Sequence, residues 1–499
     1  IMRPVMNNGI RRVMAGAVIL VALTGVWFSQ DSTSQETVPQ PVAGVAWEAC
    51  PRLELQEPAG RSVALPADPT ELPFGQVEVT TDLTVSYTDN LGRYGQLTLA
   101  AGGRMFHPNN GGCVSEFDDG PRFIVLEDGV SRQNPVPVPY LEGDPTLRSG
   151  SIVTDLSGWL GADTVYMRNS GFEQWVTLEP DSFVLQPAAR PEEAPRPGGT
   201  LTVAGFNVEN YFTTLGQRGA RDRFEFERQH TKLVAALSGL NAHLIAVAEV
   251  ENDDGVTLSR LVSGPGGLAQ VSGDSWDWVQ GEGFGRGNDD IGLAFLYRSD
   301  LLAPVGPTLA DPHAIHNRPP LAQRFRELAS GEEFTVVMNH LKSRGGCDSF
   351  DTDQGSGCWD QRRDNQVRQT MAFIEREVAP NASGGILLLG DFNAYALEAP
   401  ITRLTDSGWT DLLARFVPPL ERYTYVFEPG WAGYMDHALA DPKLAGNVCG
   451  AAVWHINADE PTFLSYSGTR FGPDHYEPGP FRSSDHDPVL VGLNLSGGC

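Results

Sequence analysis

Polar side chains that could perform chemistry follow the hydrophobic strands predicted in the second part of the chain. Asn207 and Glu249 end the first two such runs, His340 ends a later one, and Asp391 and Asn393 follow the apolar run ILLLG. Carboxylate and amide oxygens bind hard divalent cations, and an imidazole can move protons near neutral pH. Each of these residues alone is better explained as an ordinary turn or cap. Their repetition at strand ends favours a shared site, because ligand sites collect there.

The elements that must position these residues alternate between strands and helices. The apolar patterns predict strands at 200–210, 244–250, 291–298, 334–341 and 384–392, and helices at 222–240 and 365–378. This alternation predicts an α/β (α+β) domain over residues 200–497, with its sheets buried between helices.

Residues 47–188 have a different pattern, with short alternating stretches such as GQLTLAAG and RFIVLEDG separated by Gly, Pro, Asn and Asp. This pattern predicts a small all-β domain with strands of five or six residues, either a barrel or a sandwich. A Pro-rich linker follows at 189–199. One hypothesis is an OB-like barrel that guides nucleic acid; an inert spacer is the equal alternative. The candidate binding face comprises Tyr87, Arg93, Tyr94, Arg104 and Phe106.

The first 30 residues contain three arginines followed by an apolar run at 13–28. That run has the length of a signal-peptide core and is short for a membrane span, so we expect export to the extracellular space. An uncleaved anchor is the alternative and would keep the protein in the periplasm or on the cell surface. A polar linker is predicted at 31–46.

An even set of six cysteines in an exported chain favours disulfide bonds over a metal cluster. Proximity in the sequence pairs Cys347 with Cys358. The pairs Cys50 with Cys113 and Cys449 with Cys499 are then guesses among the remaining connectivities.

The formal net charge of -27 argues against broad attraction to a polyanion such as nucleic acid. Bound divalent cations and salt would weaken that objection locally. Lys232, Lys342 and Lys443 are the only lysines. Phosphate binding would therefore depend mainly on arginine, whose planar guanidinium can grip a phosphate in a bidentate manner.

Six short motifs occur in a fixed order along the second part of the chain: NVEN (207–210), AEVEN (248–252), NHLKS (339–343), GDFNA (390–394), MDHAL (435–439) and SSDHDP (483–488). Together they resemble the endonuclease/exonuclease/phosphatase superfamily, which is deoxyribonuclease I-like. Further stretches resemble bacterial two-domain extracellular nucleases. The resemblance implies a two-layered β-sandwich flanked by helices, preceded by the small all-β domain.

The resemblance also implies a division of roles among the motif residues. Asn207, Glu249 and Asp485 would hold a divalent metal, Mg²⁺ or Mn²⁺, because their oxygens are hard donors. The catalytic set would comprise His340, Asp391, Asn393, Asp436 and His486. Asp436 would support His486, and either Asp391 or His486 would be the general base.

The basic residues expected to bind phosphate are Arg318, Lys342, Arg362 and Arg363. Asp289 matches an acidic family position and is expected either to be structural or to orient a catalytic group. The Asp-bearing loop at 344–359 is either a plain disulfide-stiffened loop or the holder of a structural Ca²⁺.

Three functions compete on these observations. The first is a secreted nuclease acting on DNA, with RNA as a further substrate, and no stable protein partner is implied. The second is a phosphodiesterase or phosphatase acting on phospholipid head groups or small phosphate esters. Aromatic loops near the motifs would favour lipid, and the sequence shows none concentrated there. The third, a binding module with a decayed site, conflicts with the intact set of motif residues.

Overall fold

The computed structural model describes residues 52–65, 69–111, 122–130, 132–141, 146–167, 171–347, 353, 355–471 and 474–499. All of them belong to one compact unit, Pro39–Cys499. The predicted leader at 1–30, its apolar run at 13–28, the linker at 31–46 and the pair Cys50 and Cys113 lie outside the described residues. Within the described part of the chain, no helix is long and apolar enough to cross a membrane.

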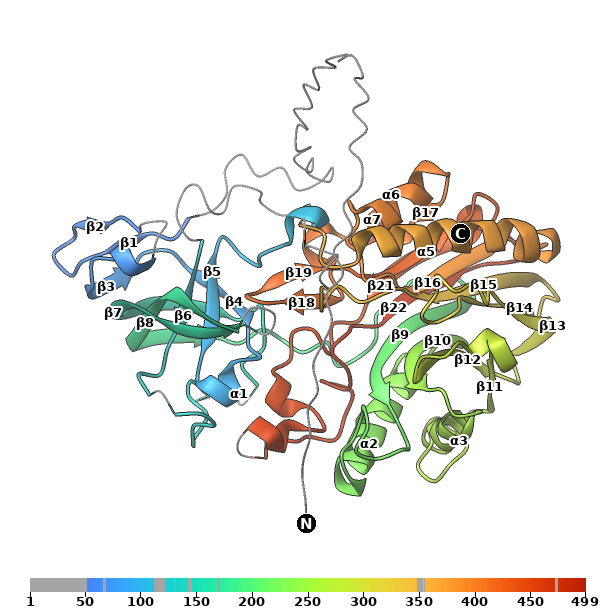
Figure 1. Cartoon of the computed structure of the whole chain (residues 1–499), viewed down its shortest axis with the longest axis horizontal. Helices are drawn as coiled ribbons and strands as arrows, with labels where there is room; N and C mark the ends of the chain where they lie inside the picture. The colour runs from blue at the N-terminus through green and yellow to red at the C-terminus, as the bar shows by residue number, and fades with distance from the viewer. Residues whose placement is uncertain are drawn as a thin grey trace, which may run out of the picture. The chain divides into compact units, whose positions relative to one another are not determined.

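The first eight strands form one sheet in the order β2-β1-β3-β7-β4-β5-β6-β8, and β7 also pairs with β8 (Figure 1). Their bounds, with the one short helix among them, are β1 Leu55–Gln56, β2 Ser62–Val63, β3 Gly75–Val79, β4 Leu83–Tyr87, α1 Leu91–Tyr94, β5 Leu97–Ala101, β6 Phe123–Leu126, β7 Ile152–Met167 and β8 Gly171–Gln186. The additional pairing closes β4, β5, β6, β8 and β7 into a barrel in which only β6 and β8 run parallel. A five-stranded barrel of this kind is OB-like, which is one of the alternatives that the sequence left open.

The predicted strand length of five or six residues is correct for β3, β4 and β5 but wrong for β7 and β8, which have 16 residues each. These two strands form one long hairpin whose register shifts between Thr154 and Gly158. The shift bends the hairpin. As a result β7 pairs with β4 at one end and with β3 further along.

The remaining strands form two six-stranded sheets with the orders β11-β12-β10-β9-β22-β21 and β13-β14-β15-β16-β20-β17, and β18 pairs with β19 in a small hairpin. The strand bounds are β9 Leu201–Tyr211, β10 Leu244–Glu251, β11 Trp276–Gln280, β12 Ile291–Arg298, β13 Leu302–Ala310, β14 Leu321–Glu327, β15 Glu333–His340, β16 Ile386–Asp391, β17 Thr410–Asp411, β18 Tyr425–Phe427, β19 Trp431–Gly433, β20 Asp436–Ala440, β21 Val448–Val453 and β22 Val489–Leu493. The helix bounds are α2 Arg223–Gly239, α3 Val256–Val262, α4 Leu268–Ser272, α5 Asp360–Phe373, α6 Ala399–Asp406 and α7 Leu412–Phe416.

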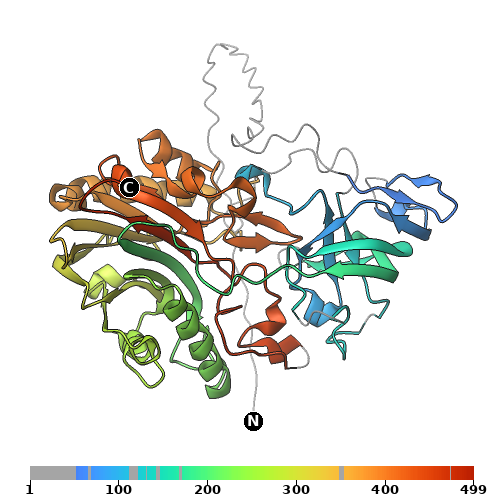
Figure 2. The same ribbon diagram turned by 180° about the vertical axis from the view of Figure 1, so that it is seen from behind.

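The two sheets pack face to face, and helices cover both outer faces (Figures 1 and 2). Val203 and Phe295 of one sheet and Val336 and Leu389 of the other belong to the same buried core. A second core lies under α2, α3 and α4, and a third lies under α5 and α6. Strands buried on both faces read as continuous apolar runs, which is why the strands were recognisable in the sequence. The predicted two-layered sandwich flanked by helices is confirmed.

Two predicted helices differ in how well their starts were placed. Helix α2 begins after Asp222, whose side chain accepts a hydrogen bond from the backbone N–H of Glu225 at 2.9 Å, as an N-cap does. Helix α5 begins at Asp360, five residues before the predicted Asn365. The early start has a consequence for the site, because it places both Arg362 and Arg363 in the first turn of the helix.

The barrel is joined to the sandwich by backbone and charged contacts. The N–H of His107 donates to the backbone oxygen of Ala432 at 2.9 Å. Arg104 forms an ion pair with buried Asp459 at 2.7 Å, and its guanidinium lies 4.2 Å from the ring centre of Tyr423. Phe106 is buried in the same contact. Placing Arg104 and Phe106 on a nucleic-acid-binding face was therefore wrong, because both residues face the sandwich.

Disulfide bonds join Cys347 to Cys358 and Cys449 to Cys499, the two expected pairs that lie in the described chain. The first closes the loop that precedes α5, and the second fixes the C-terminus to β21.

Candidate active site

The backbone of β10 bulges at Glu249. The pairing of β10 with both neighbouring strands shifts between Ala248 and Val250, and Glu249 has φ of 68°. A non-glycine residue in this left-handed region is strained, and such strain concentrates at functional positions. The bulge turns the Glu249 side chain toward Asn207, whose own position on β9 pairs with Ala248. Both residues therefore lie inside strands, and not at strand ends as predicted.

Glu249 is held by two hydrogen bonds. Its Oε1 accepts from Nδ2 of Asn207 at 3.1 Å, and its Oε2 accepts from the backbone N–H of Asn210 at 3.0 Å. Burial and the negative charge of Asp485 raise the pKa of Glu249. The two hydrogen bonds therefore orient the carboxylate of Glu249, but its surroundings do not fully compensate its negative charge.

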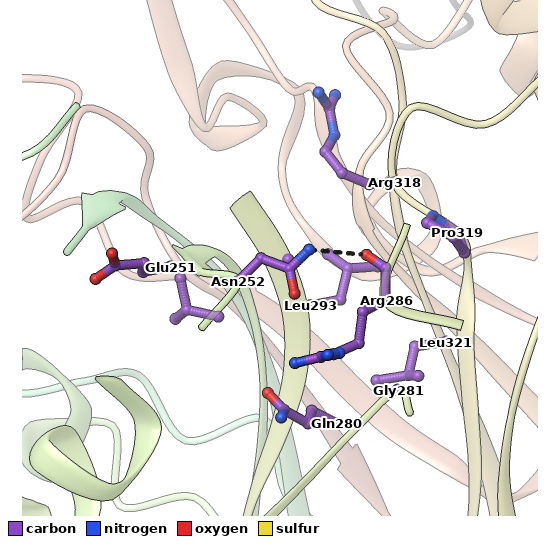
Figure 3. Close-up of a pocket in the computed structure, with 11 residues that line it drawn as sticks. Glu251, Asn252, Gln280, Gly281, Arg286, Leu293, Arg318, Pro319 and Leu321 are labelled. Atoms are coloured by element: carbon purple, nitrogen blue, oxygen red, sulfur yellow. Dashed lines mark hydrogen bonds between the residues drawn. The ribbon is translucent and has the colours of Figure 1, made fainter. Parts of the chain in front are cut away.

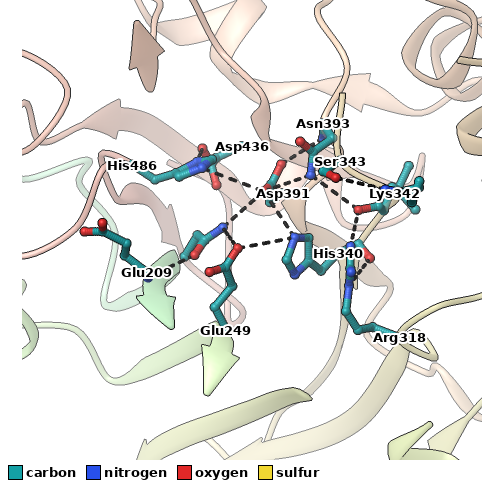
Figure 4. A network of polar contacts seen from close by, with 12 residues as sticks. Glu209, Glu249, Arg318, His340, Lys342, Ser343, Asp391, Asn393, Asp436 and His486 are labelled. Carbon is teal, nitrogen blue, oxygen red and sulfur yellow. Dashed lines mark hydrogen bonds and ion pairs between the residues drawn. The ribbon is translucent and has the colours of Figure 1, made fainter. Parts of the chain in front are cut away.

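Asp391 lies at the centre of the polar network drawn in Figure 4. Its Oδ2 accepts from Nδ2 of Asn207 and from Nδ2 of Asn393, both at 3.1 Å, and its Oδ1 accepts from the backbone N–H of Asn393 at 2.8 Å. Burial raises the pKa of Asp391 to about 7, although the positive charge of His486 opposes the rise. Asp391 thus combines an ordered position with a proton affinity suited to base catalysis near neutral pH.

His340 and His486 approach Asp391 from separate strands and loops. Nε2 of His340 lies 3.5 Å from Oδ2 of Asp391 and 3.7 Å from Oε1 of Glu249. Burial and the positive charge of Arg318 lower the pKa of His340 well below its usual value. Nδ1 of His340 has no hydrogen-bond partner among the described residues. The orienting partner that the sequence left unplaced is thus not found in this part of the chain.

His486 is paired with Asp436, as the family resemblance implied. Nδ1 of His486 lies 2.8 Å from Oδ2 of Asp436, which also accepts from Oγ1 of Thr424 at 2.7 Å. Burial opposes a charge on His486, but Asp436 and then Asp391 outweigh it and raise the pKa of His486 well above its usual value. These surroundings therefore favour the protonated ring of His486 and the neutral ring of His340.

The residues expected to hold a divalent metal fit that role in part. Glu249 and Asp485 both line the cleft and repel each other, so a cation between them would relieve the repulsion. Asn207 differs from expectation: Nδ2 donates to two carboxylates, and Oδ1 accepts from the backbone N–H of Glu209 at 3.1 Å. Its amide therefore connects the acidic groups. Ligand atoms of Asp391, Asp436 and His486 also lie within 4.8 Å of one another.

Arg318 is not a phosphate-binding residue in this structure, contrary to the prediction. It is buried, and it donates from Nε to the backbone oxygen of His340 at 3.2 Å and from Nη2 to that of Leu341. Its Nη1 forms an ion pair with Asp289 at 3.1 Å, and Asp289 also binds Arg218 at 2.9 Å. Because each of its three nitrogens already donates to a protein oxygen, Arg318 positions the end of β15, and Asp289 supports it.

Arg363 was also predicted wrongly as a phosphate-binding residue. It is fully buried, and its guanidinium donates to the backbone oxygens of Lys342, Ser356 and Cys358. Arg362 is half-buried and donates to the backbone oxygen of Ile315 at 3.3 Å. Of the four predicted basic residues, the half-buried Lys342 is left as the best candidate for a substrate contact.

The candidate catalytic residues open into a cleft of about 310 Å³ whose lining includes Glu249, His340, Asp391, Asn393, Asp485 and His486. Tyr425 and Phe427 form part of its wall, and the ring of Tyr425 lies 4.8 Å from that of His486. No aromatic concentration near the motifs was expected from the sequence. Strand β18, which pairs with β19, supplies it, because its residues Tyr425 and Phe427 both line the cleft.

A second cavity lies behind the site, between β10 and β12, where Nδ2 of Asn252 donates to the backbone oxygen of Arg286 at 3.2 Å (Figure 3). Its volume is about 10 Å³, which is room for no more than one water molecule. It is therefore too small for a substrate.

The sequence did not reveal the residues that hold the His486 loop. Nδ2 of Asn457 donates to the backbone oxygen of His486 at 2.6 Å, and Oδ1 of Asp487 accepts from the N–H of Asn457 at 2.7 Å. The only available signal was that Asn457 lies in a stretch, WHINADEP, that resembles the same nucleases.

Comparison with known proteins agrees with this geometry. The model of the endonuclease/exonuclease/phosphatase family matches residues 205–486, so the chain belongs to this family and is a phosphoester hydrolase. No curated protein matches the chain.

Several solved structures are similar to the chain at low identity. One is humanized TDP2 of D. rerio, with 13% identity and a TM-score of 0.39, covering 58% of this chain and 97% of that chain. Another is a protein of the same family from Bacteroides thetaiotaomicron, with 18% identity and a TM-score of 0.40, covering 60% and 98%. A third is the human Nocturnin catalytic domain, with 16% identity and a TM-score of 0.38, covering 58% and 93%.

Proposed function

We propose that this protein is a secreted, divalent-metal-dependent nuclease that hydrolyses phosphodiester bonds of extracellular DNA, with RNA as a further substrate. The observation that carries the proposal is the meeting of Glu249, Asp391, His340 and the His486–Asp436 pair in one cleft. The rings of Tyr425 and Phe427 beside this set suit a substrate with bases, because every base can stack on an aromatic ring. Aromatic residues near the motifs were also the feature expected of a lipid-cleaving enzyme, so the vesicle assay below decides between the two substrates.

Glu249 and Asp485 would hold the metal, Mg²⁺ or Mn²⁺, which when bound supplies charge relief to the phosphoryl oxygens. Asp391 is the group suited to take a proton from water, and Asn393 holds its carboxylate in place. His486, kept positive by Asp436, is placed to brace a phosphoryl oxygen or to protonate the leaving oxygen.

Export is supported by the two disulfide bonds, because such bonds persist in oxidising compartments. Fractionation of the native host would test it. Protein found only in the cytosol would contradict the secreted part of the proposal while leaving the chemistry intact.

The test of the chemistry is an incubation of purified protein with supercoiled and linear DNA in Mg²⁺, in Mn²⁺ and in EDTA. We expect cleavage in the metals and none in EDTA. His340→Ala and His486→Ala should abolish cleavage, whereas His313→Ala, a change at an exposed histidine outside the cleft lining, should not. Intact DNA throughout, together with release of phosphocholine from phosphatidylcholine vesicles, would favour the alternative of a lipid head-group phosphodiesterase.

A further inference from the structure

The catalytic cleft continues into a larger cavity of about 390 Å³ that reaches the barrel and is distinct from the small cavity near Asn252. Tyr87, Asp89, Asn210, Tyr425 and Asp485 line both cavities, so the two form one groove. Beyond these shared residues, the barrel contributes its own surface to the far end of the groove. The groove is therefore lined by residues of both the barrel and the sandwich.

Aromatic rings occur along this groove. At the catalytic end Tyr425 lies beside His486. At the barrel end Tyr94 and Tyr166 are half-buried neighbours whose ring centres are 5.4 Å apart with planes 33° apart. Tyr87 lines both cavities, and its hydroxyl donates to Oε1 of Glu428 at 3.3 Å. Planar side chains at intervals are suited to a chain of bases.

The arginines of the barrel-end cavity differ in their charge partners. Arg218 is paired with Asp289, Arg470 with Glu225, and the buried Arg482 lies 3.6 Å from Asp89. The fourth arginine that lines this cavity is Arg93, in the short helix α1.

Arg93 is exposed, and its guanidinium lies 5.4 Å from the ring centre of Tyr94. Among the described residues it has no ion pair with a carboxylate, unlike the other arginines of the cavity. An exposed cation beside two aromatic rings is a combination that binds a phosphate and its base together.

We propose that the barrel end of the groove binds an unpaired segment of the nucleic-acid substrate, with bases stacked on Tyr94 and Tyr166 and a phosphate held by Arg93. This inference rests on the proposed nuclease function and adds a site for nucleotides away from the cut. It assigns the barrel a role in substrate choice, toward single-stranded or locally opened polymer. Contacts such as Arg104 with Asp459 keep the two halves of the groove in register.

The test compares the full-length protein with the variants Arg93→Ala and Tyr94→Ala/Tyr166→Ala. Arg132→Ala and Trp159→Ala are the matched controls, because both side chains are exposed on the barrel and neither lines the groove. Binding of a fluorescent single-stranded oligonucleotide and of its duplex is measured in EDTA. Hydrolysis of bis(p-nitrophenyl) phosphate and of the oligonucleotide is measured in Mn²⁺.

We expect the double tyrosine variant to weaken single-strand binding about tenfold or more, with a matching rise in KM for the oligonucleotide. Its duplex binding and its hydrolysis of the small ester should stay within about twofold, because neither needs base stacking at the barrel. Arg93→Ala should weaken binding of both polymers, since a phosphate contact does not depend on base pairing.

Two results would overturn the inference and one would overturn its premise. Unchanged oligonucleotide binding in the tyrosine variant, or equal losses for single strand and duplex, would exclude a stacking site at the barrel. A wild-type protein that hydrolyses the small ester but neither binds nor cuts any polynucleotide would instead contradict the proposed function itself.

Discussion

The two histidines of the cleft carry different charges because their neighbours differ. His340 is buried next to Arg318, which holds its pKa low, whereas His486 contacts Asp436 and lies near Asp391, which hold its pKa high. A neutral ring and a charged ring on the two sides of one carboxylate can perform different steps of the same hydrolysis. At the scale of single residues, the Asp436–His486 contact is the interaction with the largest expected effect.

Replacing Asp436 with Asn should reduce kcat for DNA or for bis(p-nitrophenyl) phosphate about 10²- to 10⁴-fold. The amide keeps the shape but removes the negative charge, so the pKa of His486 falls. If the charged ring is required, activity is lost as pH rises through that pKa, and the alkaline limb of the pH profile should move to lower pH. Asp406→Asn, at an exposed aspartate, is the control. An unchanged alkaline limb would contradict a role for the His486 cation.

At the scale of elements, the bulge in β10 determines where the carboxylate of Glu249, the proposed metal ligand, points. Without the extra residue between Ala248 and Val250, the alternation of side chains along the strand would turn the following residues to the opposite face. The bulge places a strained residue, Glu249, in the middle of an otherwise regular sheet. The strained backbone at Glu249 lowers the stability of the fold and in return sets the direction of the carboxylate.

The strain is measurable by comparing Glu249→Gly with Glu249→Ala. Both changes remove the carboxylate, but only glycine adopts the positive φ of 68° without a steric cost. We expect the glycine variant to have the larger free energy of unfolding, by about 1 kcal/mol in urea titrations in EDTA, and both variants to be inactive. Equal stabilities, or a more stable alanine variant, would show that the bulge is unstrained.

At the scale of the whole molecule, the charge of -27 opposes the approach of any polyanion. Most of the cationic side chains near the cleft already bind oxygens of the protein itself. Arg318 and Arg363 hold backbone oxygens, and Arg344 binds Glu398 at 2.6 Å. If the protein acts on nucleic acid as proposed, the attraction would come from bound metal, from Lys342 and from Arg93.

This charge distribution predicts an unusual salt dependence. Proteins that make many phosphate contacts lose affinity steeply as salt rises. Here few cationic side chains are available to contact phosphate, so few counterions are released from the nucleic acid on binding. Rising salt also screens the repulsion between the nucleic acid and the acidic surface of the protein. The slope of log affinity for an oligonucleotide against log NaCl concentration should be shallower than about -2, measured by fluorescence anisotropy at fixed Mn²⁺ with the His340→Ala variant, which is expected not to cut the probe. A slope of about -5 or steeper would reveal a basic surface that this structure lacks in its described residues.

The sequence by itself determined five strands and two helices of the sandwich and most of the candidate reactive groups. Continuous apolar runs located several strands of the sandwich, because strands buried on both faces consist mostly of apolar residues. The six motifs identified Glu249, His340, Asp391 and His486 as candidates, and the structure brings all four into one cleft.

Only the tertiary structure decided which charged residues are free to act. Arg318 and Arg363 look like phosphate binders in the sequence, yet each is buried against backbone oxygens from other segments of the chain. The strand β18 and the barrel residue Tyr94 likewise reach the groove from regions distant in sequence. Local patterns report propensity and burial, whereas the partners of a side chain depend on long-range packing that no local pattern contains.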